Sequence, residues 1–325
     1  MESRMEHLQC LTPDELKRRP DLSTFRWRLL AHGDSWFSFA AAKVDAHANL
    51  LEELVFGQPT VAVSCAGHHN ALRRMVDLES SPDFIRLLTD PSAPTWDGVL
   101  LSVGGNDLVS AAMVPAVQAN GEPVPMNLRL LRKQTEWGAP SAGVSRYFSE
   151  DGWATFGEYV RANLKHVLSL RDAGPSQGKP LFIHCYAVPT PRPAGAESAS
   201  GAWLYPALKA YAIPQADWAA MSRLMLSKLA ALFKACAADA AQYPSLQVFD
   251  STQVPIAPAA LGSSGISGDW HNEIHLNHSG CFKIARAWSV HIEAVLSGKP
   301  LVTAPPTTGR GRRGGGGGGS APASA

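Results

Sequence analysis

Short apolar runs alternate with longer amphipathic stretches along most of the chain. The short runs end in polar or glycine-rich turns, a pattern typical of buried parallel strands. They predict strands at residues 28–31, 60–64, 98–103, 180–186 and 246–250. The longer stretches predict helices at residues 37–55, 84–88, 153–170, 218–241 and 281–296. Within 153–170, for example, Phe156, Val160, Leu164 and Val167 fall on one helical stripe.

Strands separated by helices predict an α/β fold, a five-stranded parallel sheet with helices on both faces. In such sheets, binding and catalytic groups collect at the carboxyl ends of the strands. Residues 110–149 have no clear period, and we interpret them as a possible lid or wall over such a site.

Composition divides the chain into three parts. We expect an N-terminal extension at 1–24, one domain at 25–300 and a disordered tail at 301–325, because the tail is rich in Pro, Gly and Arg and has few apolar residues to bury. The net charge is only +1, so no global charge favours nucleic acid or an anionic membrane.

The cysteines and the N-terminus bear on location. The five cysteines follow no repeating spacing, which favours a reducing compartment over a disulfide framework. Charged residues interrupt every candidate signal-peptide stretch near the start, and no apolar run is long enough to span a bilayer. We therefore expect a cytoplasmic protein with no membrane span.

The first predicted strand runs directly into the turn His32-Gly33-Asp34-Ser35-Trp36. Ser35 would lie at a helix N-terminus, where free amides and the helix dipole favour negative charge. A serine in this position suits nucleophilic attack, although Ser and Asp are also common helix caps.

Two further strand ends carry glycines and an amide. The second strand is followed by Gly67, whose backbone amide could approach a ligand closely. The third strand ends in Gly104-Gly105-Asn106-Asp107, where the Asn106 side chain offers an uncharged donor that could stabilise an oxyanion. Either segment could instead be an ordinary polar turn.

A histidine-rich segment precedes the last predicted helix. Its sequence is Asp269-Trp270-His271-Asn272-Glu273-Ile274-His275-Leu276-Asn277-His278. From a loop at this position, a histidine could reach Ser35 over the edge of the sheet.

Together, the four segments resemble those of the SGNH/GDSL hydrolases, in the same order along the chain. Gly33-Asp34-Ser35, Gly67, Gly104-Gly105-Asn106-Asp107 and His275 match the family's four blocks. The resemblance implies a flavodoxin-like three-layer α/β/α sandwich without a metal or other cofactor. It implies that Ser35 attacks the ester, that His275 is its base, and that the amides of Ser35 and Gly67 and the side chain of Asn106 form the oxyanion hole.

The sequence departs from the family pattern at the third triad member. The family usually has Asp three residues before its histidine, and this chain has Asn272 there. Asp269 lies further upstream and Glu273 lies nearby. If the segment forms a helical turn, Asn272 shares a face with His275 and Asp269 does not. We therefore expect Asn272 to orient His275, with Asp269 as the rival.

The predicted function is hydrolysis of a carboxylic ester through an acyl-enzyme, with a small-molecule, glycan or lipid ester as the substrate. One alternative is a catalytically weak or inactive protein that binds a carbohydrate or acyl ligand. A second is a metal-dependent hydrolase, because His271, His275 and His278 have helical spacing. Trp36, Trp203, Tyr205 and Trp270 are aromatic candidates for lining an acyl or sugar pocket.

Overall fold

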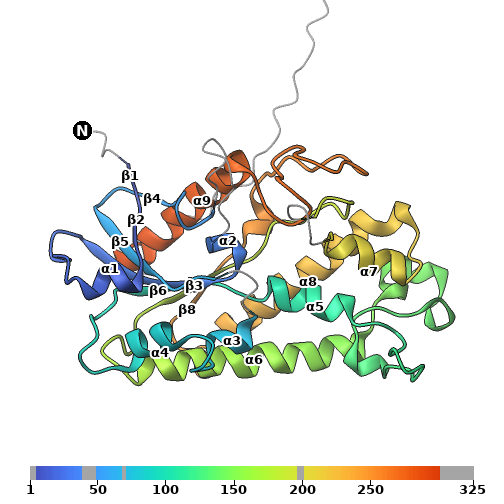
Figure 1. Cartoon of the computed structure of the whole chain (residues 1–325), viewed down its shortest axis with the longest axis horizontal. Helices are drawn as coiled ribbons and strands as arrows, with labels where there is room; N and C mark the ends of the chain where they lie inside the picture. The colour runs from blue at the N-terminus through green and yellow to red at the C-terminus, as the bar shows by residue number, and fades with distance from the viewer. Residues whose placement is uncertain (1–4, 39–48, 68–70, 196–200, 301–325) are drawn as a thin grey trace, which may run out of the picture.

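A computed structural model describes residues 5–38, 49–67, 71–195 and 201–300 (Figure 1). Its strands are β1 (Glu6–His7), β2 (Gln9–Leu11), β3 (Trp27–Gly33), β4 (Val55–Phe56), β5 (Thr60–Ser64), β6 (Gly98–Ser102), β7 (Leu181–His184) and β8 (Leu246–Phe249). Its α-helices are α1 (Pro13–Lys17), α2 (Ser35–Ser38), α3 (Leu72–Met75), α4 (Pro82–Thr89), α5 (Gly105–Met113), α6 (Glu150–Asp172), α7 (Leu204–Ala210), α8 (Trp218–Ala238) and α9 (His278–Leu296).

The main sheet is parallel, with the strand order β2-β5-β3-β6-β7-β8. Without β2, the strands follow the 2-1-3-4-5 order of a flavodoxin-like fold. The predicted fold class is therefore confirmed. The predicted strand number was wrong, because the described residues already form six strands of this sheet. The sixth, β2, comes from the segment that composition set apart as an N-terminal extension, and it pairs with the edge of β5.

Helices cover both faces of the sheet. Figure 1 shows α9 and α2 on one side and α4 and α6 on the opposite side. On the first side, the Trp288 ring of α9 packs against Phe37 and His184, with ring centroids 5.9 and 5.1 Å apart. All five residues of β6 are buried, as expected for a central strand covered on both faces.

The five predicted strands and four of the predicted helices lie close to the positions of β3, β5, β6, β7, β8, α4, α6, α8 and α9, but the helix predicted at 37–55 was wrong over most of its described part. The helix α2 extends to Ser38, residues 39–48 lie outside the described residues, and 50–53 form a turn. Val55 then belongs to β4, which pairs with β1. The segment is apolar enough for either a helix or a strand. The pairing of β4 with β1, which the local pattern does not show, decides that Val55 belongs to a strand.

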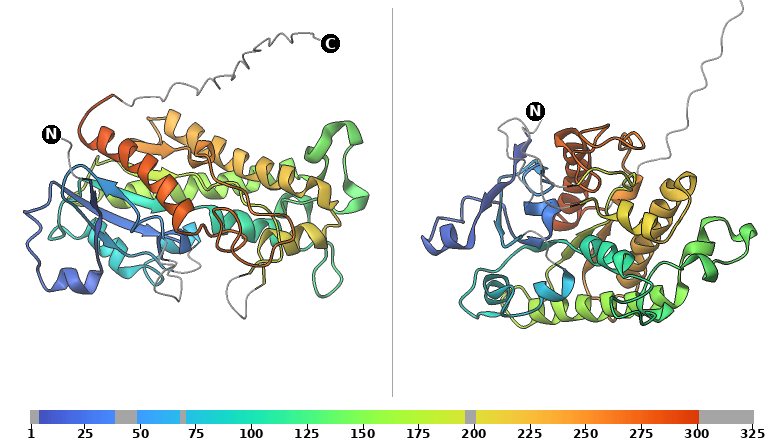
Figure 2. Two further views of the ribbon diagram at one scale, coloured as in Figure 1. Left: turned by 90° about the horizontal axis from the view of Figure 1, so that it is seen from above. Right: turned by 45° about the vertical axis from the view of Figure 1, so that its right-hand side comes forward.

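The aperiodic stretch at 110–149 is ordered by an arginine. After α5, it contains the 3₁₀ helices Met126–Leu128, Gln134–Glu136 and Pro140–Tyr147. The buried Arg129 guanidinium donates to the carbonyls of Val124 and Leu131 and to both carboxylate oxygens of Glu136, at 2.6–3.1 Å. The stretch extends away from the sheet at the far end of the molecule (Figure 2).

The tail predicted at 301–325 lies outside the described residues. In the part of the chain that the structure describes, no helix combines the length and the apolar character needed to cross a membrane.

Candidate active site

Ser35 is the first residue of α2, directly after β3. Asp34 holds the turn: its Oδ1 accepts a hydrogen bond from the Trp36 amide at 3.0 Å, and its amide donates to the Ser102 carbonyl at 3.1 Å. The Ser35 side chain is 7% exposed. Because β6 pairs with the end of β3, this turn is tied to the centre of the sheet.

A buried polar network lies beneath the serine turn. The Asp34 carboxylate accepts from the Ser102 hydroxyl at 2.8 Å and the Tyr186 hydroxyl at 2.5 Å, and Ser102 Oγ also lies 2.9 Å from Nε2 of His184. Burial raises the pKa of Asp34 to about 6, although the hydrogen bonds from Tyr186, Ser102 and Trp36 oppose the shift. Burial lowers the pKa of His184 to about 3, so this imidazole is neutral near pH 7. The network fixes the backbone that carries Ser35.

The structure brings Ser35 and His275 together. Nε2 of His275 lies 2.6 Å from Oγ of Ser35, although the residues are 240 positions apart in the chain. His275 is 5% exposed, and the edge of the Trp203 ring covers it, with centroids 5.4 Å apart. A hydroxyl and an imidazole at this distance can exchange a proton.

Asn272 contacts the other ring nitrogen of His275. Its Oδ1 lies 3.0 Å from Nδ1 and also accepts from the backbone amides of Ile274 and His275, at 3.1 and 2.8 Å. With Oδ1 as the acceptor, an N–H on Nδ1 would donate to Asn272 and Nε2 would accept from Ser35. Nδ2 of Asn272 also lies within 2.9 Å of Nδ1. An amide group can therefore favour the wrong tautomer, which a carboxylate would exclude.

Asp269 is engaged elsewhere. Its Oδ2 accepts from Nζ of Lys283 and the Ala257 amide, at 2.5 and 2.6 Å, and its Oδ1 accepts from the Ser279 hydroxyl at 2.9 Å. Burial alone would raise the pKa of Asp269, but these bonds, with Lys283 foremost, lower it. None of these partners is His275, so the position of Asp269 favours Asn272 as the residue that orients the imidazole.

We expect Asn272→Asp to raise kcat at least about tenfold, because a carboxylate holds one tautomer and stabilises the imidazolium. Asp269→Asn should leave kcat within a factor of about three, while the loss of the Lys283 pair lowers the melting temperature. Steady-state kinetics measure kcat of both variants, and thermal denaturation measures their melting temperatures. A loss of several orders of magnitude in Asp269→Asn, with no gain in Asn272→Asp, would assign Asp269 as the acid instead.

Glu273 links the start of α7 to the loop at residues 269–277, which we call the histidine loop. This fully buried carboxylate accepts from the amides of Trp203, Leu204 and Tyr205 and from the Arg192 amide. Three of these donors are at or beside the first turn of α7, where a negative charge is favoured. Burial raises the pKa of Glu273 to about 7, although the amide hydrogen bonds oppose the shift.

The Arg192 guanidinium holds the same loop from the other side. It is buried and donates to the Asn272 carbonyl at 2.7 Å. Through its other terminal nitrogen, it donates to the carbonyls of Ser263 and Gly265. The segment that positions His275 is therefore held by two buried ionisable groups rather than by regular secondary structure.

Glu273→Gln should flatten the pH dependence of stability. Because the pKa of Glu273 is raised in the folded state, its stabilising contribution is complete below pH 4.5 and is lost as the pH rises through about 7. The wild-type melting temperature should fall more between pH 5 and pH 8 than that of the variant. Glu79→Gln, at an exposed position, is the control and should keep the wild-type slope. Equal slopes in wild type and Glu273→Gln would show that Glu273 does not titrate in this range.

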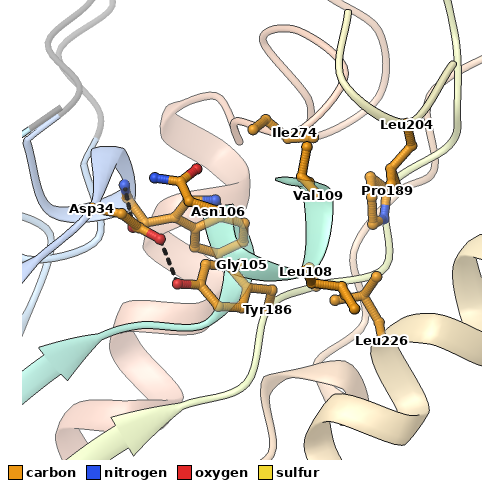
Figure 3. Close-up of a pocket in the computed structure, with 12 residues that line it drawn as sticks. Asp34, Gly105, Asn106, Leu108, Val109, Tyr186, Pro189, Leu204, Leu226 and Ile274 are labelled. Atoms are coloured by element: carbon orange, nitrogen blue, oxygen red, sulfur yellow. Dashed lines mark hydrogen bonds between the residues drawn. The ribbon is translucent and has the colours of Figure 1, made fainter. Parts of the chain in front are cut away.

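The Ser35 amide and the Asn106 side chain are two of the predicted oxyanion donors. No hydrogen bond from the Ser35 amide is present within the described residues, and this amide begins α2. Asn106 follows a glycine turn at the start of α5 and lies beside Asp34 (Figure 3). Gly104 has φ +89°, and a Cβ at Gly105 would lie 2.6 Å from the Tyr186 ring. Only glycines therefore let this turn bring Asn106 to the site.

The Gly67 amide does not match its predicted use. It donates to the carbonyl of Gly33 at 3.1 Å, which links the end of β5 to the serine turn. Acting as an oxyanion donor would require Gly67 to give up that bond. The sequence pattern placed the glycine correctly at a strand end next to Ser35 but did not indicate where its N–H points.

An apolar pocket opens beside Asn106 (Figure 3). Its volume is about 30 Å³, and residues from six separate parts of the chain line it. They are Asp34, Trp36, Gly105, Asn106, Leu108, Val109, Tyr186, Ala187, Pro189, Leu204, Leu226 and Ile274. None of these residues lies in 110–149, so that stretch does not form the wall predicted for it.

The aromatic candidates have different roles. Trp36 lines the pocket and Trp203 covers His275. Tyr205 instead packs its ring on Trp218, and Trp270 is 1% exposed in the core. Among these four, only Trp36 belongs to the pocket wall.

The histidines of the last segment do not form a metal site. Residues 271–274 form bends rather than a helix, and α9 begins only at His278. Nδ1 of His278 lies 2.8 Å from the Glu53 carboxylate. Across the described residues, no group of three or more His, Cys, Asp or Glu side chains is arranged to hold a metal ion. The helical spacing that suggested a metal site was therefore misleading.

Several residues that support the site are not among those predicted from the sequence. Ser102 and His184 are polar residues inside otherwise apolar strands, a signal that could have singled them out. Tyr186 and Arg192 follow β7 in a segment without periodicity. Their partners, Asp34 and the histidine loop, are distant in sequence, so no local pattern could identify them.

The sequence matches no protein-family model and no curated protein. The structure is similar to those of carbohydrate acetylesterase Est24 from Sinorhizobium meliloti (11% identity, 83% of this chain and 100% of that one, TM-score 0.42) and a putative arylesterase from Agrobacterium tumefaciens (15%, 83% and 99%, TM-score 0.40). It is also similar to the aryl esterase of M. smegmatis (11%, 82% and 99%, TM-score 0.43). Likenesses of this degree carry no argument about the reaction.

The strand order gives the chain a flavodoxin-like α/β fold that carries the predicted site segments. The serine turn follows β3, the glycine turn with Asn106 follows β6, and the histidine loop precedes α9.

Proposed function

We propose that the protein is a serine hydrolase that cleaves carboxylic esters through an acyl-enzyme intermediate. The observation that carries this proposal is the 2.6 Å contact between Oγ of Ser35 and Nε2 of His275, with Asn272 on the opposite ring nitrogen. A hydroxyl, an imidazole and an orienting acceptor in line are the elements of a nucleophile activated by a base.

In the first half of the reaction, Oγ of Ser35 attacks the carbonyl carbon and its proton passes to Nε2 of His275. The tetrahedral intermediate then expels the alcohol oxygen, which takes that proton, and the acyl group remains on Ser35. In the second half, His275 removes a proton from water, which attacks the acyl carbon. When this intermediate collapses, Ser35 regains its proton and the carboxylic acid leaves.

The oxyanion of both intermediates would be bound by the Ser35 amide and the Asn106 side chain. The hydrogen bond from the Trp36 amide to Asp34 fixes the turn that carries the Ser35 amide. The close approach of Gly105 to the Tyr186 ring fixes the turn that carries Asn106. Donors held in place before the reaction stabilise the transition state without a reorganisation cost. With the Gly67 amide bonded to Gly33, we assign the oxyanion hole to two donors.

Asn272 would orient the imidazole without a full negative charge. The imidazolium formed during attack is then stabilised less than by a carboxylate, so turnover should be modest. Burial of Ser35 and His275, which are 7% and 5% exposed, limits access of water to the acyl-enzyme.

A fluorophosphonate probe tests the proposal directly, because it reacts with a serine only when a neighbouring base activates it. The probe should label the wild type stoichiometrically on the peptide that contains Ser35, as located by mass spectrometry, and should abolish hydrolysis of aryl esters. Binding of an acyl or sugar ligand without labelling or hydrolysis would instead support the inactive binding protein.

A further inference from the structure

The pocket beside Asn106 has features that narrow the class of substrate, if the proposed ester hydrolysis holds. Its deep walls are aliphatic and buried: Leu108, Leu204 and Leu226 are 1%, 1% and 5% exposed, and Pro189 is also buried. Figure 3 shows these side chains grouped away from Asp34 and Asn106. The polar end of the pocket is therefore at the proposed oxyanion donor, and the apolar end lies beyond it.

The polar groups at the pocket do not suit a charged or hydroxylated ligand. The lining residues include no Lys, Arg or His. The one carboxylate, Asp34, already accepts from Trp36, Ser102 and Tyr186, and the Tyr186 hydroxyl is the donor of one of those bonds. A sugar hydroxyl or a second carboxylate buried here would lose its hydrogen bonds to water without replacement.

The pocket is on the acyl side of the scissile bond. The leaving alcohol oxygen must lie near Nε2 of His275, which protonates it. The pocket instead begins at Asn106, where the carbonyl oxygen would point, and neither Ser35 nor His275 lines it. The group that extends past Asn106 is therefore the acyl chain.

The size of the pocket sets the chain length. A volume of about 30 Å³ holds roughly two or three water-sized groups. Leu226 of α8 and Leu204 of α7 close the deep end, and both helices pack in the core. We propose that this pocket is an acyl subsite for short, uncharged aliphatic acyl groups, of about two to four carbons, and that Leu226 sets its depth.

The test compares kcat/KM for p-nitrophenyl acetate, butyrate and octanoate, which share one leaving group. The wild type should prefer butyrate over octanoate at least tenfold. Leu226→Ala should raise the octanoate-to-butyrate ratio about tenfold or more, because it deepens the subsite. Leu232→Ala is the matched control: it lies on the same helix, is 6% exposed and does not line the pocket, so it should keep the wild-type ratio.

Val109→Ala is a second variant, should Leu226→Ala fold poorly. Val109 is 9% exposed, and its replacement by Ala widens the pocket with a smaller loss of packing than Leu226→Ala. The variant should therefore raise the octanoate-to-butyrate ratio several-fold. Wild-type ratios in a folded Leu226→Ala or Val109→Ala protein would overturn the subsite, as would a wild type that cleaves octanoate as well as butyrate. If Leu226→Ala instead changes kcat/KM only along a series of acetate esters with longer alcohols, the pocket binds the alcohol and the acyl subsite is wrong.

The same assay separates the two proposals. Should the wild type hydrolyse no ester faster than Ser35→Ala, the proposed function fails and the subsite fails with it. Should hydrolysis depend on Ser35 but show no effect of pocket size, the function stands and only the acyl subsite is wrong.

Discussion

Ser35→Ala should reduce ester turnover by about four to six orders of magnitude while the protein stays folded. The variant removes the atom that attacks the carbonyl, and only binding and oxyanion donors would remain to accelerate the reaction. The melting temperature should change little, because the turn is held by Asp34 and not by the Ser35 hydroxyl.

Steady-state kinetics and thermal denaturation on the purified variant check this result. Ser38→Ala is a suitable control, because Ser38 lies on the same short helix and its hydroxyl donates to the Asp34 carbonyl. It should keep near wild-type activity. Appreciable turnover in folded Ser35→Ala would reject the nucleophile and the mechanism built on it.

Asn106→Ala should lower kcat about 10²–10³-fold, or roughly 2.7–4 kcal/mol, with little change in KM. An oxyanion donor contributes mainly in the transition state, so its loss affects kcat rather than substrate binding. Asn106→Asp keeps the side-chain size but replaces the donor with a negative acceptor, and it should lose at least as much activity.

The split between kcat and KM for these variants distinguishes a donor from a packing residue. Asn163→Ala is the control and should leave both constants unchanged, because Asn163 lies on α6 and its side-chain amide donates to the Tyr159 carbonyl. A pure increase in KM for Asn106→Ala would assign Asn106 to substrate binding, and activity retained in Asn106→Asp would rule out a donor role.

The fold was predictable because its signals are local. Apolar runs such as 60–64 and amphipathic stretches such as 153–170 repeat with the period of the element they form, and β5 and α6 lie there. Where an apolar segment suited two structures, as at 50–56, the local pattern failed, because pairing of β4 with β1 decided it.

Sequence by itself determined the α/β architecture, the strand ends that carry Ser35, Asn106 and Gly67, and the loop that carries His275. Only the tertiary structure decided which groups meet. It placed Asn272 against His275 and Asp269 against Lys283, turned the Gly67 amide to Gly33, and buried Glu273 at the start of α7. Periodicity depends on neighbours within a few residues, but the contact of Ser35 with His275 joins positions 240 residues apart, and the pocket walls come from residues between 34 and 274. The approach of such distant segments is set by packing of the whole core.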